Sequence, residues 1–417
     1  MSAANTTATY GSVAKTLHWA TALLILTLVP LGFIAVAWPY DTSDSLATKA
    51  LLFSIHKTLG VGVFFLALAR IAWALSQPRP VPLHPQRRLE TTLAEGVHWA
   101  LYVALVAVPL TGWVHHAATT GFAPIWWPLG QTLPFVPQST ALAEATASLH
   151  RAFVFLLLAT LALHVAGALK HHLVDRDGTL ARMWPGRRAP VPAAPGRRHA
   201  PAPAAAAFGI YALVGAVALL TAPGAEPRSV AATAIAAEGG ATLEGAARWR
   251  VESGSLGFTV RSLGNPVTGR FAEWSAQIAF DEEADADGRH GAVEVLILVE
   301  SMSLGSVTAQ ARGPEFFAVE THPTARFGAE IVAAEGGGYE ARGTLDLVGA
   351  SVPVSLPFTL AIDGDTARAA GTVTVDRRAF GMGQSYSDET TVGFAVEIAF
   401  ELEARREDGA PGAGPRS

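Results

Sequence analysis

The chain of 417 residues contains no cysteine. The absence of thiols excludes disulfides, thiolate-bound metals, iron–sulfur clusters, covalently attached c-type haem and a cysteine nucleophile. Charged residues are also scarce, at 16%, whereas hydrophobic residues make up 50% of the chain. Soluble domains usually carry about 25% charged residues, so this composition is typical of a membrane protein. The net charge of −5 is small and gives no indication of a nucleic-acid partner.

Long apolar runs fill the first half of the chain. A helix that crosses a bilayer needs about 20 mostly apolar residues. Five segments meet or approach this requirement: 13–38, 51–75, 93–116, 147–172 and 204–222. The first of them lacks the basic start and the early cleavage site of a signal peptide, so we expect it to be retained. The sequence therefore predicts four spanning helices followed by a fifth.

Arginines in the connecting loops predict how these helices are oriented. The loops after the second and fourth segments carry Arg79, Arg87, Arg88, Arg176, Arg182, Arg187, Arg188, Arg197 and Arg198. The loops after the first and third segments are nearly free of basic residues, with Lys49 as the exception. Because basic loops stay on the cytoplasmic side, we expect a multi-pass inner-membrane protein with a cytoplasmic N-terminus. Everything beyond the fifth helix is then periplasmic.

Composition also predicts the connections and the end of the chain. Residues 187–203 are rich in proline and alanine, which predicts an extended, semi-rigid linker on the cytoplasmic side. Residues 406–417 are rich in glycine and proline, which predicts a disordered tail. These segments separate a bundle over residues 8–186, the fifth helix over 204–222 and a different domain over 247–405.

The C-terminal domain shows the period-two alternation of β-strands. Apolar residues alternate with alanine and glutamate over residues 394–402, which is typical of a half-buried strand. Similar runs occur at 256–260, 276–280, 292–300, 325–331, 343–348, 352–362 and 369–375. Turn sequences separate them at 264–266, 285–288, 336–338 and 363–365. About eight strands at this spacing predict an antiparallel barrel or sandwich, and an eight-stranded barrel has room for one small or elongated apolar ligand.

Four of the histidines within the predicted spanning helices are the leading candidate ligands: His18, His56, His150 and His164. Ligating residues at membrane depth are functional candidates, and neutral imidazole is a good iron ligand. His150 and His164 are 14 residues apart, so they share nearly one helix face and are separated by about 21 Å along the axis. One helix can therefore offer a ligand near each side of the membrane.

Helix direction selects the partners of these two ligands. His56 begins an inward-running helix, which brings it level with His150 near the outer face. His18 begins an outward-running helix, which brings it level with His164 near the inner face. The pattern therefore predicts two bis-histidine b-type haem sites, with His98 as an alternative ligand on the inner side. We expect the remaining membrane histidines to be interfacial side chains that water or headgroups satisfy: His115, His116, His171 and His172.

The first half resembles the prokaryotic cytochrome b561 family. The matching motifs are residues 15–19 (KTLHW), 55–57 (IHK), 109–113 (PLTGW), 149–150 (LH), 163–164 (LH) and 170–172 (KHH), within roughly residues 8–186. The resemblance implies that His18, His56, His150 and His164 bind two haems, and it argues against His98. It also implies exchange of electrons with membrane quinone, since some members oxidise superoxide and pass the electron to quinone.

The second half is similar to the YceI family, which is named for a periplasmic lipocalin-like barrel that binds polyisoprenoid lipid. The matching stretches are residues 264–271 (GNPVTGRF), 315–327 (EFFAVETHPTARF), 343–357 (GTLDLVGASVPVSLP) and 376–383 (DRRAFGMG). Ser262 departs from the family, which commonly has a histidine there. We interpret most of these motifs as turns and barrel corners, so inward-facing apolar side chains would bind the ligand.

Together these patterns predict a membrane four-helix haem bundle with one further helix, followed by an antiparallel lipocalin-like barrel. The leading hypothesis is a haem-dependent oxidoreductase or electron carrier, which exchanges electrons with an isoprenoid quinone and uses superoxide or quinol as possible donors. Its barrel would bind an isoprenoid lipid or quinone. The alternative is an isoprenoid-binding or delivery protein in which the helices serve mainly as an anchor.

Overall fold

The computed structural model describes residues 2–119, 122–186, 201–221 and 247–407. The chain separates into a helical unit, formed by most of the N-terminal half, and a β-rich unit built mainly from the C-terminal half. Each unit is described by itself. Most of the predicted linker and nearly all of the predicted tail lie outside the described residues.

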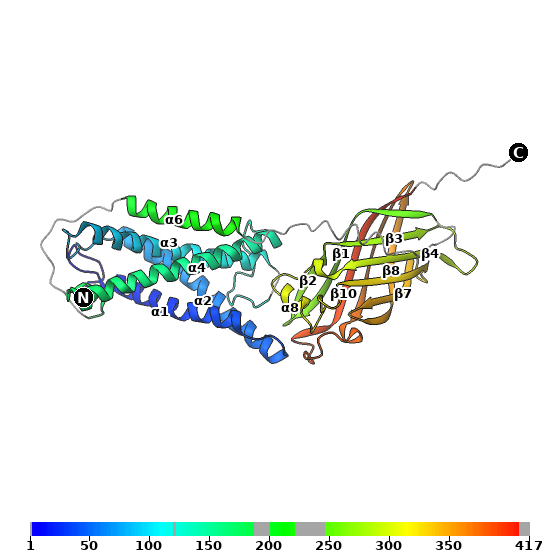
Figure 1. The fold of residues 1–417 in the computed structure, drawn as a ribbon, viewed down its shortest axis with the longest axis horizontal. Helices are drawn as coiled ribbons and strands as arrows, with labels where there is room; N and C mark the ends of the chain where they lie inside the picture. The colour runs from blue at the N-terminus through cyan, green and yellow to red at the C-terminus, as the bar shows by residue number, and fades with distance from the viewer. Residues whose placement is uncertain (1, 120–121, 187–200, 222–246, 408–417) are drawn as a thin grey trace. The chain divides into compact units, whose positions relative to one another are not determined.

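Five long apolar helices make up the first unit, as predicted. They are α1 (Ser12–Ala37), α2 (Ser43–Ser76), α3 (Arg88–Ala118), α4 (Thr140–Leu169, continued as a π-helix over Lys170–Val174) and α6 (Pro201–Leu220), with the short α5 (Thr179–Met183) between the last two. The helices lie side by side (Figure 1), and each of the five long ones is long and apolar enough to cross a membrane. The protein is therefore a multi-pass membrane protein.

Large apolar side chains cover the outside of this bundle. Leu23, Phe65 and Phe155 are more than half exposed, which suits contact with lipid rather than water. Inside, small residues allow the helices to approach closely. Gly215 of α6 packs against Phe153 of α4, and the ring of Tyr211 contacts the same phenylalanine in a tilted arrangement, with the ring centroids 5.3 Å apart. The fifth helix is therefore packed into the bundle and is more than a tether.

Helix α6 begins at Pro201, slightly ahead of the predicted start at residue 204. The difference has a simple cause, because proline is well tolerated in the first turn of a helix, where its missing N–H would have no partner. Pro201 and Pro203 both fall in that first turn, although the segment around them has the proline- and alanine-rich composition of a linker.

Antiparallel strands close into a barrel in the second unit. The strands are β1 (Arg248–Ser262), β2 (Asn265–Phe271), β3 (Trp274–Phe280), β4 (Arg289–Leu298), β5 (Met302–Ser303), β6 (Thr324–Ala333), β7 (Tyr339–Leu347), β8 (Ala350–Asp363), β9 (Thr366–Asp376) and β10 (Val392–Arg406). Strand β1 pairs with both β3 and β10, so eight strands form a closed ring (Figure 1). Strands β2 and β5 extend the sheet beside β1. The predicted barrel is confirmed.

The prediction of a turn over residues 264–266 is wrong in its extent. Ser262 pairs with Asn265, so the turn consists of Leu263 and Gly264, both with positive φ, and Asn265 already belongs to β2. Two-residue hairpin turns of this kind match the twist of the strands they connect. Strand β2 was missed because Pro266 and Gly269 lower its strand propensity.

Candidate functional site

The four predicted ligands form two pairs inside the helical unit. The imidazole rings of His18 on α1 and His164 on α4 have centroids 6.1 Å apart. Those of His56 on α2 and His150 on α4 are 6.5 Å apart. The structure thus brings together the same partners that helix direction selects in the sequence.

The two pairs lie at different levels of the bundle. Both α4 ligands belong to one uninterrupted helix, so about 21 Å of helix rise separates them. At the His164 end, the indole N–H of Trp19 donates to the carbonyl of Met183 at 2.9 Å. The start of α1 therefore lies beside the segment that follows α4, which is the arrangement that antiparallel helices require.

The spacing within each pair suits a metal held between two imidazoles. Metal–nitrogen bonds of about 2 Å on either side of an ion place the ring centroids roughly 6 Å apart. Nδ1 of His150 lies 2.9 Å from the carbonyl oxygen of Val108, to which it can donate. That hydrogen bond fixes the tautomer in which Nε2 is free to bind a metal.

Glycines lie against both outer histidines. A Cβ atom added to Gly32 of α1 would come within 2.9 Å of the ring of His56. One added to Gly112 of α3 would come within 3.0 Å of the ring of His150. Any larger residue would push on these imidazoles, so the two glycines leave space for the rings of His56 and His150.

The inner pair has two further neighbours. Nη2 of Arg70 lies 3.1 Å from Nδ1 of His18, and because arginine cannot accept a proton, it acts as the donor. If His18 were to bind a metal through Nε2, Nδ1 would carry the ring proton, and this contact would have to break while the charge of Arg70 stayed beside the site. His98 also belongs to this level, since its ring centroid lies 5.2 Å from that of His164. The contact agrees with its predicted depth.

The expectation that water or headgroups satisfy the other membrane histidines is wrong for three of them. His115 contacts the carbonyl of Ala143 at 2.8 Å. His116 is only 4% exposed and its Nε2 lies 2.9 Å from Oε1 of Gln131. His171 pairs with an aspartate, whereas His172 is exposed as expected. The sequence could not show these partners, because they depend on tertiary packing: Ala143 belongs to α4, whereas Gln131 and Asp177 lie in connecting segments that fold back onto the helices.

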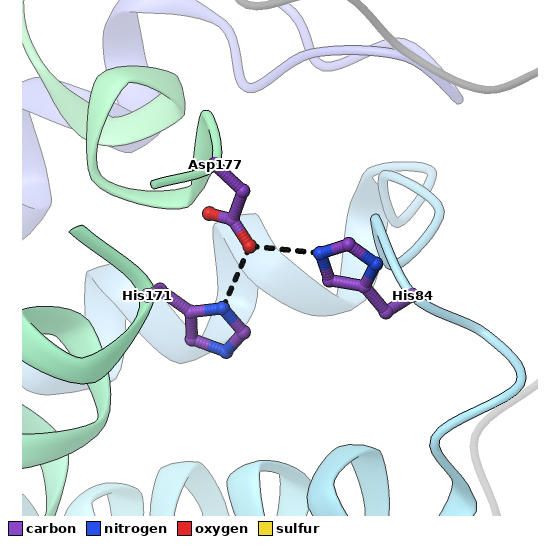
Figure 2. A group of neighbouring side chains, drawn as sticks. All are labelled: His84, His171 and Asp177. Carbon is purple, nitrogen blue, oxygen red and sulfur yellow. Dashed lines mark hydrogen bonds and ion pairs between the residues drawn. The ribbon is translucent and has the colours of Figure 1, made fainter. Parts of the chain in front are cut away.

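One cluster at the His164 end of the bundle was not predicted at all. His84, from the loop between α2 and α3, and His171, from the π-helical turn after α4, both point at the carboxylate of Asp177 (Figure 2). The distances to Oδ2 of Asp177 are 3.0 Å from Nε2 of His84 and 2.7 Å from Nδ1 of His171. No motif joins His84 to residues so far along the chain, so spacing gave no signal.

The barrel encloses an apolar cavity of about 260 Å³. Its walls are almost entirely hydrocarbon and include Phe258, Phe271, Phe358, Leu360 and Phe400. Such a lining offers shape and apolar contact, with few groups that could recognise a polar ligand. Ser262 also lines this cavity.

Arg377 is the charged residue in the cavity lining, but its guanidinium is hydrogen-bonded to the backbone and has a structural role. The side chain is 3% exposed. It donates to five carbonyl oxygens, those of Met382, Gly383, Tyr386, Val392 and Gly393, at 2.6–3.1 Å. With its donors taken up, it fastens the turn after β9 to β10. This agrees with the interpretation of residues 376–383 as a barrel corner.

Comparisons with known proteins divide the chain in the same way. Residues 9–186 match the family model of prokaryotic cytochrome b561, and residues 249–404 match that of the YceI-like domain. Cytochrome b561 homolog 2 of Escherichia coli is 29% identical over 187 residues, which cover 44% of this chain and 95% of that protein. The probable superoxide oxidase CybB of Yersinia pestis is 26% identical over 176 residues, which cover 41% of this chain and 93% of that protein.

Among solved structures, the crystal structure of Burkholderia cenocepacia BcnA is 30% identical. The match covers 36% of this chain and 95% of that one, with a TM-score of 0.33.

Proposed function

Because the chain belongs to the prokaryotic cytochrome b561 family in its membrane half and to the YceI-like family in its barrel, we propose that it carries electrons across the membrane through two b-type haems. The partner in the bilayer is an isoprenoid quinone, and superoxide or a quinol is the candidate donor. The single observation that carries this proposal is the presence of two histidine pairs at two levels of one bundle.

His56 and His150 would hold the outer haem, and His18 and His164 the inner one. When bound, each haem supplies an iron that takes up and releases one electron. The protein supplies the ligands, the apolar surroundings and the fixed separation between the two levels. Gly32 and Gly112 leave room beside the outer pair, and Arg70 places a positive charge at the inner one.

Loop charges support an orientation with the inner pair on the cytoplasmic side. The arginine-rich loops follow α2 and α4, at the end of the bundle where His18 and His164 lie. Under the positive-inside rule this end faces the cytoplasm, and the barrel, which follows the outward-running α6, is periplasmic.

The cavity supports a role for the barrel in binding an isoprenoid lipid or the isoprenoid tail of a quinone. An apolar chain buried there gains about 25 cal/mol for each Å² removed from water. The predominantly apolar lining of the cavity suits a hydrocarbon tail better than a polar headgroup. The barrel would then present a quinone-like molecule to the outer level of the bundle.

The same cavity favours a second candidate function, an isoprenoid-binding or delivery protein that the helices anchor in the membrane. The two candidates differ in a measurable way. Electron transfer requires haem, whereas delivery requires only the barrel and its anchor.

The deciding experiment counts haems in the purified full chain. We expect two per chain from the pyridine haemochrome, a dithionite-reduced spectrum of b type, and reduction or oxidation of a quinone analogue. A purified chain with no haem absorbance would leave the anchor function as the better account. If removal of residues 247–407 leaves quinone turnover unchanged and the delipidated barrel binds no isoprenoid, the proposed coupling between barrel and bundle fails.

A further inference from the structure

His84, His171 and Asp177 form a compact ligand set outside the proposed haem sites. Their two ring nitrogens and one carboxylate oxygen all lie within 4.8 Å of one another (Figure 2). The two imidazole rings are parallel, with an interplanar angle of 3° and centroids 6.3 Å apart. Two nitrogen ligands and one oxygen ligand at such distances can reach a single ion with little movement.

The loop that carries His84 is fixed independently of this cluster. Arg182 is buried, and its guanidinium donates to the carbonyl of Val81 at 2.8 Å and to that of Ala8 at 2.9 Å. The N–H of Val81 donates to the carbonyl of Thr7 at 2.9 Å. His84 follows this anchored segment directly, so the ligand set is organised before any ion binds.

The charge at the cluster also suits a cation. Oδ1 of Asp177 accepts a hydrogen bond from the backbone N–H of Thr179 at 2.8 Å, which leaves Oδ2 directed at the two imidazoles. An aspartate carboxylate is ordinarily ionised at neutral pH. In the part of the chain that the structure describes, the basic side chains within 4.0 Å of this carboxylate are those of His84 and His171, which can donate to it as neutral imidazoles.

A neighbouring group of Glu90, His171 and Asp175 is a weaker candidate. Its carboxylates are already paired with cations, since Lys170 contacts both of them and Arg87 lies 3.1 Å from Oδ1 of Asp175. A metal ion there would have to displace two positive side chains. At Asp177 it displaces only imidazole protons, which can move to the other ring nitrogen.

We propose that His84, His171 and Asp177 bind a divalent transition-metal ion of the zinc class. Two imidazoles and a carboxylate are ligands that such ions favour, whereas Mg²⁺ and Ca²⁺ prefer sets made of oxygen. The side chains of His84 and His171 are 29% and 20% exposed, so water can reach the site and complete the coordination. The ion would lock the loop after α2 onto the end of α4.

The site lies close to the inner pair of histidines but shares no residue with it. His171 follows His164 by seven residues, or roughly 10 Å of helix rise. The proposal therefore stands whether or not haem is bound at His164, and metal content can be measured separately from iron.

The test uses the purified full chain in detergent, stripped with a chelator and dialysed against Zn²⁺ in the presence of excess Mg²⁺. Zinc and iron are then measured by mass spectrometry for the wild type, His84→Gln, Asp177→Asn and the matched control His172→Ala. Glutamine at position 84 can still donate to Asp177 but is a poor zinc ligand. Iron content shows whether each variant keeps its haem and its fold.

We expect one zinc per chain in the wild type and in His172→Ala. Loss of an outer-shell partner alone usually weakens metal binding by about 10–100-fold, so loss of a ligand should weaken it at least about a hundredfold. Equal zinc retention in His84→Gln and the wild type, or no retention in either, would overturn the proposal. If the variants lose their fold, the zinc X-ray absorption spectrum of the wild type tests the proposal instead. A spectrum with fewer than two imidazole ligands on the zinc would contradict the proposed site.

Discussion

The close contact between Gly112 and His150 gives a quantitative prediction about the proposed outer haem site. A Cβ at position 112 would lie 3.0 Å from two atoms of the imidazole ring. Alanine in place of glycine favours a helix by about 1 kcal/mol, whereas overpacking a tight contact costs about 1–3 kcal/mol. Gly112→Ala should therefore cost up to about 2 kcal/mol, and the extra methyl groups of Gly112→Val should raise the cost to at least about 3 kcal/mol.

A cost of about 3 kcal/mol corresponds to roughly a hundredfold weaker binding of haem at the outer level. We expect Gly112→Val to purify with one haem per chain, measured by the pyridine haemochrome. Its redox titration should show a single transition, that of the inner haem. Gly62→Val is the matched control, because a Cβ there meets nothing within 4 Å. Two haems with unaltered potentials in Gly112→Val would refute the assignment of His150 as a ligand.

Two further predictions address the ligands and the barrel. His164→Ala should remove only the inner haem and His56→Ala only the outer one, so each variant should keep one haem per chain; a variant that keeps both would break the proposed pairing. In the barrel, Gly383→Ala should lower the melting temperature more than Gly364→Ala. Both glycines have positive φ, but a Cβ at 383 would meet the guanidinium of Arg377 at 2.6 Å, whereas one at 364 meets nothing within 4 Å. The clash should cost about 1–3 kcal/mol, or roughly 2–12 °C by circular dichroism of residues 247–407, and equal melting temperatures would show that Arg377 yields freely.

The sequence predicts the elements whose signals are periodic. Runs of about 20 apolar residues predict the five helices, because the bilayer imposes that length. Alternation over residues 394–402 predicts β10, because one face of that strand lines the barrel interior. The separation of His150 and His164 also predicts their common face, since the rise and rotation of a helix are nearly constant.

The sequence could not predict contacts that depend on loops folding back. His84 and Asp177 meet through two connecting segments whose paths no local pattern records. One partner of His116, Gln131, comes from the loop that follows its own helix, and the same loop brings Ala123 to Lys57 of α2, which also contacts His116. Strand β2 was missed for a related reason, because its partner β1 stabilises it against its own weak propensity.

Helix α4 fixes the distance between the two histidine levels of the bundle. Both of its histidines belong to one hydrogen-bonded helix, so their separation is set by backbone geometry and not by how neighbouring helices pack. A substitution that tilts α1 or α2 can disturb the ligand at one level, yet it cannot move the two levels apart. A membrane that thins or thickens around the protein would alter the tilt of the bundle but leave this distance unchanged. If both levels hold haem, the rate of electron tunnelling between them, which falls steeply with distance, would then be insensitive to membrane thickness.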